Sequence, residues 1–314
     1  MISIAVVSAS GPRSGIGHRR RADRIAEAAS RRVDVAVSRT DLGDDPDTEA
    51  LVRALVGAAT NDAIVIDVPP PLRSERLARH LEDLRHRDHR TIGVDGPADG
   101  VDVLFVPSFV LDDETALRQQ AGTLDVRWGW DHLLIDQRRD IAPRHAGAPL
   151  LVLTGGSDAA GLGRTLPALL DARLDAGTAV EWVVGPHAPE PELPTAPLLE
   201  WRLLSDLDDL RTTMERAGHA LAVYGVTLLE LLHHGVPSVV LSPYGDRDVV
   251  QLEVLEEEGL ALTATDAHRA VEQLVGLMAD PMAAGELARR AAARIPESGV
   301  ERVVDVMLEL AKRS

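Results

Sequence analysis

The sequence contains no cysteine and few aromatic residues. Without cysteine, the chain can form neither disulfide bonds nor thiolate metal sites. Aromatic residues make up only 3% of the 314 residues, so valine, leucine, isoleucine and alanine must build the hydrophobic cores. Hydrophobic residues make up 45%, which is enough for packed interiors and argues against a disordered chain. At this length, two domains of about 150 residues each are expected.

Positive charge is also scarce, because the formal net charge is −17 and Lys312 is the only lysine. Such a surface repels phosphate backbones and anionic headgroups, so we expect neither a nucleic-acid nor a membrane-surface partner. No hydrophobic run approaches the ~20 residues that span a bilayer. Residues 1–7 lack a basic leader and are typical of a strand. We therefore expect a cytoplasmic protein without membrane insertion, and the oligomeric state stays open.

Short aliphatic runs alternate with longer segments rich in Ala, Leu, Arg and Glu, a pattern typical of βα units around parallel sheets. A Pro- and Gly-containing linker is expected over residues 143–149, which predicts domains over residues 1–143 and 147–314. The second domain is expected to end in an amphipathic helix over residues 301–312. The fold class is α/β, with two Rossmann-like doubly wound domains facing a cleft. Strands are expected at residues 2–8, 33–37, 63–67, 91–94, 101–107, 150–154, 179–184, 220–223 and 238–241.

A glycine-rich loop is predicted between the first strand and the first helix. Gly15 and Gly17 permit a tight turn, and the free N–H groups at the helix start favour an anion. His18 is expected in the first helical turn, where its imidazole could act as a general base. Arg21 adds donors for phosphate. A purely structural turn is the alternative interpretation of the two glycines.

Two further loops are expected at strand ends of the second domain, where α/β sheets bind ligands. Gly155, Gly156 and Ser157 follow the first strand, although Ser157 or the next residue, Asp158, could simply cap a helix. A later strand ends at Gly225.

At Gly225 a strand is expected to end and a helix to begin. Gly225 and the amides of Val226 and Thr227 could cradle a diphosphate. Glu230, about one turn further on, is placed to accept hydrogen bonds from ribose hydroxyls. The alternative is that Glu230 is an ordinary solvated carboxylate.

Metal and hydrolase-triad chemistry are not expected. His80, His86 and His89 stand among arginines, which disfavour a cation, and are interpreted as a solvated face. No Asp-x-Asp motif stands at a strand end, and no Ser-His-Asp arrangement is evident. We therefore predict no metal and no cofactor.

Residues 15–21, Gly-Ile-Gly-His-Arg-Arg-Arg, resemble the Gly-x-Gly-His-x-x-Arg motif of the UDP-sugar hydrolases of pseudaminic acid biosynthesis. That family is similar to the glycosyltransferases that build lipid II and to spore-coat polysaccharide proteins. The resemblance covers most of the chain and implies a GT-B fold with the nucleotide held mainly by the second domain. It also implies that His18 activates water, that no metal takes part, and that Glu230 holds the ribose.

Four positions depart from the family's pattern. Where the family has a Tyr and a nearby Arg between its domains, this chain has His132 and Asp136. Where an Asn-Gln pair is expected after the last nucleotide-binding strand, it has Arg247 and Asp248.

Three functions are consistent with these residues. The first is hydrolysis of a nucleotide-diphosphate sugar, preferably a UDP-sugar, with His18 as the base. The second is transfer of the sugar to a small or lipid acceptor by a GT-B glycosyltransferase. The third is a non-catalytic nucleotide-sugar-binding subunit, which the four altered positions would suit.

Overall fold

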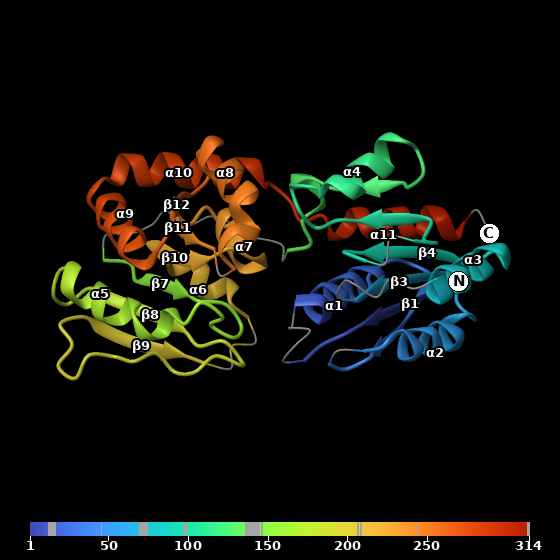
Figure 1. The fold of residues 1–314 in the computed structure, drawn as a ribbon, viewed down its shortest axis with the longest axis horizontal. Helices are drawn as coiled ribbons and strands as arrows, with labels where there is room; N and C mark the ends of the chain where they lie inside the picture. The colour runs from blue at the N-terminus through green and yellow to red at the C-terminus, as the bar shows by residue number, and fades with distance from the viewer. Residues whose placement is uncertain are drawn as a thin grey trace. The chain divides into compact units, whose positions relative to one another are not determined.

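The structure is a computed structural model of the chain. It describes residues 1–11, 17–44, 46–68, 75–96, 99–135, 145, 147–205, 207, 209–242 and 244–312. The chain divides into two compact units (Figure 1). Unit 1 comprises Met1–Ile135 together with Ser298–Ser314, and unit 2 comprises Asp136–Glu297.

Unit 1 is built on a parallel sheet of six strands in the order β2-β1-β3-β4-β5-β6. The strands are β1 (Ile2–Ser8), β2 (Val35–Asp41), β3 (Ala63–Asp67), β4 (Arg90–Val94), β5 (Val103–Phe105) and β6 (Val126–Arg127). The helices are α1 (Gly17–Ser30), α2 (Thr48–Ala58), α3 (Glu75–His86), α4 (Asp113–Gln120), the 3-10 helix η1 (Trp130–His132) and α11 (Val300–Ala311).

Side chains of β1 alternate between two buried faces of this sheet. Ile4 and Val6 pack in a cluster with residues of α1 and α11. Ala5 and Val7 pack on the opposite face with residues of α2 and α3. Successive strand residues point to opposite faces, so covering both faces requires a continuous hydrophobic run. Each fully buried aliphatic side chain contributes about 1.5–3 kcal/mol.

Unit 2 also has a parallel sheet of six strands, in the order β12-β11-β10-β7-β8-β9. The strands are β7 (Leu150–Leu153), β8 (Ala179–Val183), β9 (Glu200–Leu204), β10 (His219–Val223), β11 (Ser238–Leu241) and β12 (Leu262–Ala264). The helices are η2 (Leu162–Arg164), α5 (Leu166–Arg173), α6 (Arg211–Arg216), α7 (Val226–His233), η3 (Gly245–Asp248), α8 (Val249–Glu257), α9 (Ala267–Ala279) and α10 (Pro281–Arg294).

Aspartate side chains start helices in both units. Asp47 accepts a hydrogen bond from the Ala50 N–H at 2.7 Å at the start of α2. Asp112, Asp266 and Asp280 cap α4, α9 and α10 in the same way. Such a cap contributes about 1 kcal/mol because it satisfies an orphan N–H group. Part of the acidic excess therefore serves helix initiation.

The nine expected strands are present, three of them with the expected bounds and six with shifted ends, and three further strands are not expected from the sequence. The largest shift is at β2, which covers Val35–Asp41 rather than residues 33–37. The missed strands are β6, β9 and β12. β6 has two residues and β12 has three, too few for a visible pattern. β9 lies at the sheet edge, where the exposed Glu200 and Arg202 interrupt the hydrophobic run that marks a buried strand.

The expected place of the terminal helix is wrong. The sequence pattern places it in the second domain, but α11 belongs to unit 1. Val303, Val304 and Met307 are fully buried in the same cluster as Ile4 of β1. The periodicity of a helix identifies its buried stripe, but does not specify which sheet that stripe covers.

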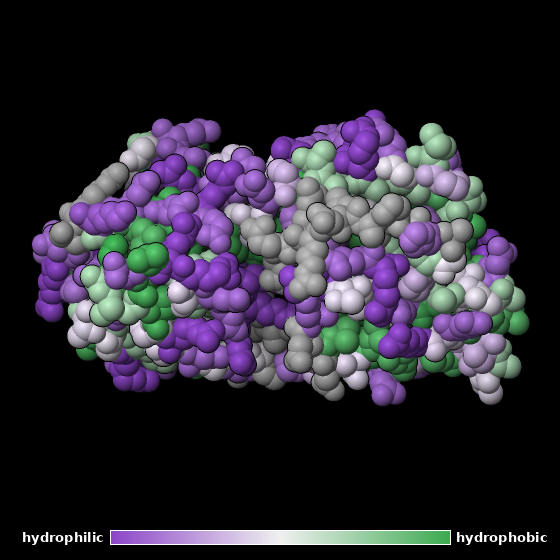
Figure 2. All heavy atoms as spheres, turned by 180° about the vertical axis from the view of Figure 1, so that it is seen from behind, coloured by the Kyte–Doolittle hydropathy of each residue, from purple (hydrophilic) through white to green (hydrophobic). Residues whose placement is uncertain are grey.

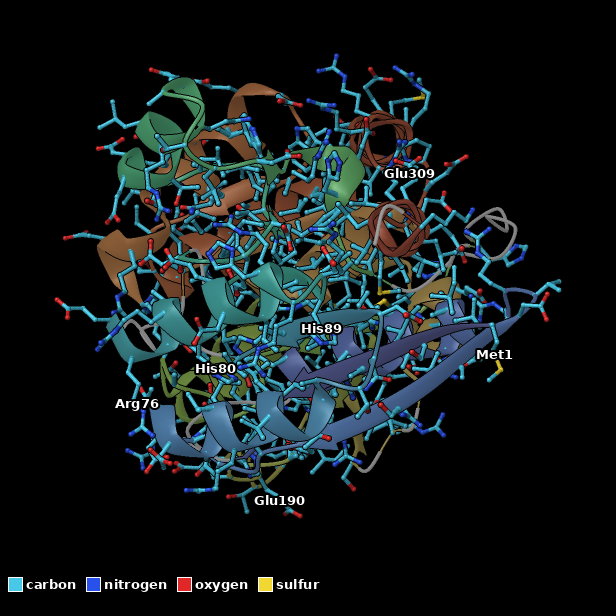
Figure 3. The ribbon with its side chains drawn as sticks, turned by 90° about the vertical axis from the view of Figure 1, so that its right-hand side faces the viewer. Met1, Arg76, His80, His89, Glu190 and Glu309 are labelled. Atoms are coloured by element: carbon cyan, nitrogen blue, oxygen red, sulfur yellow. The ribbon has the colours of Figure 1, made fainter. Side chains whose placement is uncertain are left out.

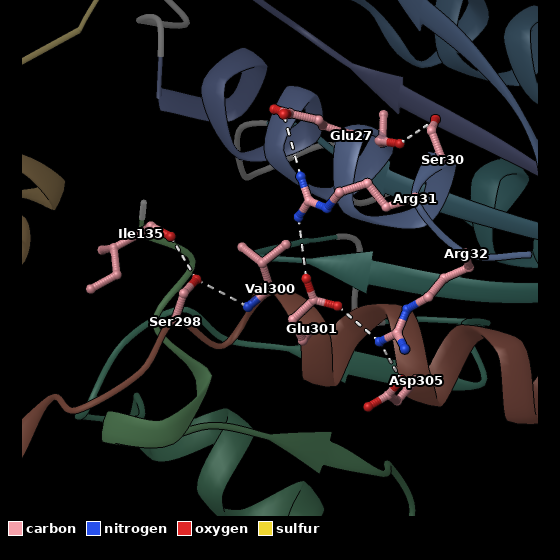
Figure 4. Close-up of polar contacts among 10 residues, drawn as sticks. Glu27, Ser30, Arg31, Arg32, Ile135, Ser298, Val300, Glu301 and Asp305 are labelled. Carbon is pink, nitrogen blue, oxygen red and sulfur yellow. Dashed lines mark hydrogen bonds and ion pairs between the residues drawn. The ribbon is translucent and has the colours of Figure 1, made fainter. Parts of the chain in front are cut away.

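Ion pairs at the end of α1 strengthen the contact with α11 (Figure 4). The Arg31 and Arg32 guanidinium groups donate to the two carboxylate oxygens of Glu301 at 3.2 and 2.8 Å. Arg32 also donates to Asp305 at 2.7 Å. Because Arg32 and Glu301 are partly exposed, each pair contributes less than about 1 kcal/mol. The buried stripe of α11 supplies most of the attachment.

On the face drawn in Figure 2, hydrophilic residues predominate and smaller hydrophobic areas lie between them. The large exposed hydrophobic side chains come from many separate elements, among them Val56 of α2, Leu117 of α4 and Met282 of α10. Among the described residues, no helix is both long and apolar enough to cross a lipid bilayer.

Candidate functional site

The strand order of unit 1 reverses between β1 and β3. The chain moves from β1 outward to β2, returns past β1 to β3, and continues to β6. In doubly wound sheets, ligands bind beyond the carboxyl ends of the two strands that flank such a reversal. α1 begins at Gly17, shortly after β1, and β3 ends at Asp67. A Cβ on Gly17 would meet nothing within 4 Å, so its backbone is open to close approach.

His18 lies in the first turn of α1, and its imidazole contacts the carboxylate at the end of β3. Nδ1 of His18 is 2.7 Å from Oδ1 of Asp67. The side chain of Asp67 is fully buried, whereas that of His18 is 12% exposed. A buried carboxylate that is hydrogen-bonded to Nδ1 fixes the orientation of the imidazole ring. Nε2 then points away from that carboxylate. This is the arrangement that a general base requires. Gly15, also predicted for this site, lies outside the described residues.

Arg21 is the second partner of Asp67. Its Nε donates to Oδ2 of Asp67 at 3.0 Å and its Nη2 donates to Oδ1 at 2.8 Å, which makes a bidentate ion pair. Burial opposes the charge of Arg21, but the charge of Asp67 and its hydrogen bonds outweigh burial and raise the pKa of Arg21 above its usual value. Arg21 was predicted to donate to a phosphate. It is only 6% exposed, and its Nε and Nη2 donate to carboxylates, so donation to a phosphate stays a prediction.

Asp95 completes this cluster from the next strand. It directly follows β4, and its Oδ2 accepts from Nη2 of Arg21 at 3.2 Å. Its side chain is 38% exposed, far more than those of Asp67, Arg21 and His18. Both aspartates were missed in the sequence. The available signal was a carboxylate at the carboxyl end of each of two predicted strands, a position that parallel sheets use for function.

The strand order of unit 2 reverses between β7 and β10. The predicted loops Gly155–Ser157 and Gly225–Thr227 follow these two neighbouring strands, so the sheet brings them to the same reversal point. Gly155 has a φ of +87°, which favours glycine. Gly155, Gly156 and Ser157 are exposed. Asp158, rather than Ser157, is the residue that caps: it accepts from the N–H groups of Leu162 and Gly163, both at 2.9 Å.

The start of α7 offers backbone amides at the same reversal point. The helix begins at Val226 after Gly225, whose φ of +154° is far from helical. Among the described residues no side chain caps this helix start. A Cβ on Gly225 would meet nothing within 4 Å, which leaves the backbone open to a ligand. Uncapped amides beside an open glycine are suited to bind an anion.

Glu230 lies one turn into α7 and is only 5% exposed. The interpretation of Glu230 as an ordinary solvated carboxylate is therefore wrong. Buried carboxylates are rare without hydrogen-bonding partners, because desolvation of the charge is costly. The buried carboxylate of Glu230 therefore belongs to the same end of α7 as Gly225.

Two residues that the sequence did not indicate support the glycine loop of unit 2. Gly185 follows β8, and a Cβ there would lie 2.3 Å from the carbonyl oxygen of Gly155. The His187 N–H donates to the carbonyl oxygen of Gly156 at 2.8 Å. No motif marks these residues, since their role depends on the adjacency of β7 and β8.

Positions that depart from the family pattern have structural partners here. His132 lies in η1, where burial lowers its pKa, and its ring packs against Phe105 at 5.9 Å between centroids. Asp136 lies outside the described residues. Asp248 is buried and accepts from Ser242 Oγ at 2.5 Å, and the Arg247 guanidinium lies over the Tyr244 ring at 5.9 Å.

The histidines of the predicted solvated face lie on α3 and near β4 (Figure 3). His86 is exposed on α3, and His89 Nδ1 lies 2.9 Å from the carbonyl oxygen of Asn61. In the described part of the chain, no group of three or more His, Asp or Glu residues could hold a metal ion.

Solved structures share this architecture over nearly their whole length. The calicheamicin glycosyltransferase CalG4 matches with a TM-score of 0.62 and 15% identity, over 100% of this chain and 99% of that chain. MurG of Acinetobacter baumannii matches with a TM-score of 0.60 and 13% identity, over 98% and 99%. UDP-GlcNAc 2-epimerase of Neisseria meningitidis, bound to UDP-GlcNAc, matches with a TM-score of 0.61 and 10% identity, over 98% and 100%.

No protein-family model matches the sequence, and no curated protein matches it either. At identities of 10–15%, the structural likeness shows the fold and not the reaction. Two Rossmann-like units with parallel six-stranded sheets, together with these matches, show that the chain has the GT-B fold.

Proposed function

We propose that this protein hydrolyses a nucleotide-diphosphate sugar, with UDP as the favoured nucleotide. The observation that carries the proposal is the 2.7 Å contact between His18 Nδ1 and the buried carboxylate of Asp67, at the strand reversal of unit 1. With Nδ1 directed to Asp67, Nε2 is the nitrogen left to take a proton from water.

The proposed reaction is a single displacement. The water oxygen attacks C1 of the sugar while its proton passes to Nε2 of His18. The bond between C1 and the diphosphate oxygen breaks, and its electron pair leaves with the diphosphate. The products are the free sugar and the nucleoside diphosphate, and the imidazolium returns its proton to solvent. Asp67 stabilises the positive charge that develops on the imidazole.

The nucleotide is assigned to unit 2. The open glycines Gly155 and Gly225 and the amides at the start of α7 suit a diphosphate. Glu230 is proposed to accept hydrogen bonds from the ribose hydroxyls. The matched structures include an epimerase solved with UDP-GlcNAc, which supports a UDP-sugar for this chain as well.

Glycosyl transfer is the second candidate, because two of the matched structures are a glycosyltransferase and MurG. In that reaction Nε2 of His18 would deprotonate an acceptor hydroxyl in place of water. A non-catalytic role is less consistent with the cluster around His18. The buried Arg21–Asp67 ion pair is costly to form. Nucleotide binding alone does not require a histidine that such a pair orients as a base.

Incubation with a panel of UDP-, CMP-, GDP- and dTDP-sugars tests the proposal, with release of nucleotide and of free sugar measured separately. Hydrolysis predicts equal amounts of both without any added acceptor. Nucleotide release that requires an acceptor would replace hydrolysis by transfer. Tight binding without turnover under either condition would overturn both reactions.

A further inference from the structure

Nη2 of Arg21 lies within hydrogen-bonding distance of three groups. It is 2.8 Å from Asp67 Oδ1, 2.8 Å from His18 Nδ1 and 3.2 Å from Asp95 Oδ2. His18 Nδ1 is itself 2.7 Å from Asp67 Oδ1. The Arg21 nitrogen, the His18 nitrogen and the Asp67 oxygen therefore form a closed triangle, with Asp95 outside it.

Counting hydrogens shows that these contacts compete. A guanidinium Nη2 carries two hydrogens. The first Nη2 hydrogen is donated to Asp67 Oδ1. Together with the Nε hydrogen, which is donated to Asp67 Oδ2, it makes the bidentate ion pair. The second hydrogen has two possible acceptors, Asp95 Oδ2 and His18 Nδ1.

The choice between these acceptors sets the tautomer of His18. If the second hydrogen goes to Asp95, Nδ1 keeps its own proton, donates it to Asp67, and leaves Nε2 as the basic nitrogen. If it goes to Nδ1, that nitrogen is an acceptor, the ring proton sits on Nε2, and the imidazole is unable to take a proton there.

The geometry points to Asp95 as a positioning residue that holds His18 in its basic form, by accepting the second Nη2 hydrogen of Arg21. The inference rests on the proposed function in one respect, because the proposed function assigns Nε2 of His18 as the base. The tautomer itself is measurable without any substrate.

The chain offers a matched control for Asp95. Asp88 and Asp95 flank the same strand, β4, and both have a φ of +64°. Replacing either by alanine therefore carries the same backbone strain, since only glycine, asparagine and aspartate adopt this conformation readily. Asp88 lies at the exposed amino end of β4, away from His18. Comparing Asp95→Ala with Asp88→Ala separates the carboxylate's effect from that strain.

Long-range nitrogen–proton NMR correlations of the full chain labelled with ¹⁵N-histidine report the tautomer. The signals of His18 among the 11 histidines are identified by their loss in His18→Asn. The wild type should carry the proton on Nδ1. In Asp95→Ala the population should move to the form protonated on Nε2, with a smaller change in Asp95→Asn, which keeps an acceptor oxygen. Asp88→Ala should match the wild type.

Two results would overturn the inference: a wild type already protonated on Nε2, or a tautomer unchanged in both Asp95 variants. If Asp95→Ala fails to fold, Asp95→Asn alone decides.

Turnover of a substrate found in the sugar-nucleotide panel gives a second readout. Because only the competent tautomer reacts, each tenfold loss of its population should lower kcat about tenfold. KM should not change. If no sugar nucleotide is hydrolysed but the tautomer moves as expected, the proposed function fails and the role of Asp95 stands.

Discussion

Gly185, after β8, packs directly against the peptide groups of Gly155 and Gly156. A Cβ at position 185 would lie 2.3 Å from the carbonyl oxygen of Gly155 and 2.6 Å from that of Gly156. Both neighbours are backbone atoms, so a side chain at position 185 must displace the loop rather than a flexible group. The shape of the proposed diphosphate loop thus depends on the next strand of the sheet.

Gly185→Ala should weaken UDP binding about tenfold or more, because the loop moves while the rest of unit 2 stays folded. Isothermal titration calorimetry measures the affinity. Gly276→Ala, where a Cβ meets nothing within 4 Å, is the control in the same unit. Equal affinities for both variants would mean that residues 155–156 do not hold the nucleotide.

Glu230→Ala should reduce the binding free energy of UDP by about 1.5–3 kcal/mol, the loss expected for a charge-assisted hydrogen bond. A 2′,3′-dideoxy nucleotide should bind both forms equally, since it lacks the hydroxyls that Glu230 is proposed to hold. Glu253→Ala, an exposed glutamate on α8, is the control. Equal losses for the two nucleotides would show that Glu230 supports the helix and not the ribose.

His18→Asn should lower kcat roughly 10²–10⁴-fold and leave UDP affinity nearly unchanged, because asparagine does not accept a proton at neutral pH. His86→Asn changes an exposed histidine of the same unit and should retain full activity. Should His18→Asn instead lose thermal stability while keeping its activity per folded molecule, His18 would be a structural residue.

The stability of unit 1 should depend on pH through His132. Burial lowers the pKa of this imidazole below its ordinary 6.5, so the unfolded chain takes up the proton first. The contribution of His132 is fully present above pH 6.5 and is lost as the pH falls toward the lowered pKa.

Thermal melting at pH 7.5 and at pH 5.5 tests this dependence. The loss of melting temperature on acidification should be smaller in His132→Gln than in the wild type, and unchanged in the exposed control His86→Gln. An identical loss of melting temperature in all three proteins would show that a group other than His132 causes the acid sensitivity.

The fold class and the position of His18 could be predicted because they depend on local pattern. Alternating hydrophobic runs indicate βα units, and a glycine loop before a helix indicates where His18 stands. The Asp67 partner could not be predicted in this way. It is 49 residues from His18, and their contact requires β1 and β3 to be neighbours in the sheet.

The carboxylate partners of Arg21 could not be predicted for the same reason. An arginine near the start of a helix, considered alone, indicates a substrate donor. Only the positions of Asp67 and Asp95, at the ends of two other strands, show that Nε and Nη2 of Arg21 donate to carboxylates. Long-range contacts between strand ends decide which charged groups remain available to a ligand.

The return of α11 to unit 1 has a consequence for the order in which the chain can fold. Unit 2 is a continuous stretch, Asp136–Glu297, whereas the core of unit 1 lacks Val303, Val304 and Met307 until the last helix is synthesised. At about 5–20 residues per second, the ribosome needs roughly 10–30 s to make unit 2. Throughout that interval, the face of the first sheet that carries Ile4 and Val6 is covered by α1 but lacks α11, the second helix that packs on it. Nascent unit 1 therefore exposes part of its hydrophobic core to aggregation and to chaperone binding until α11 has been made.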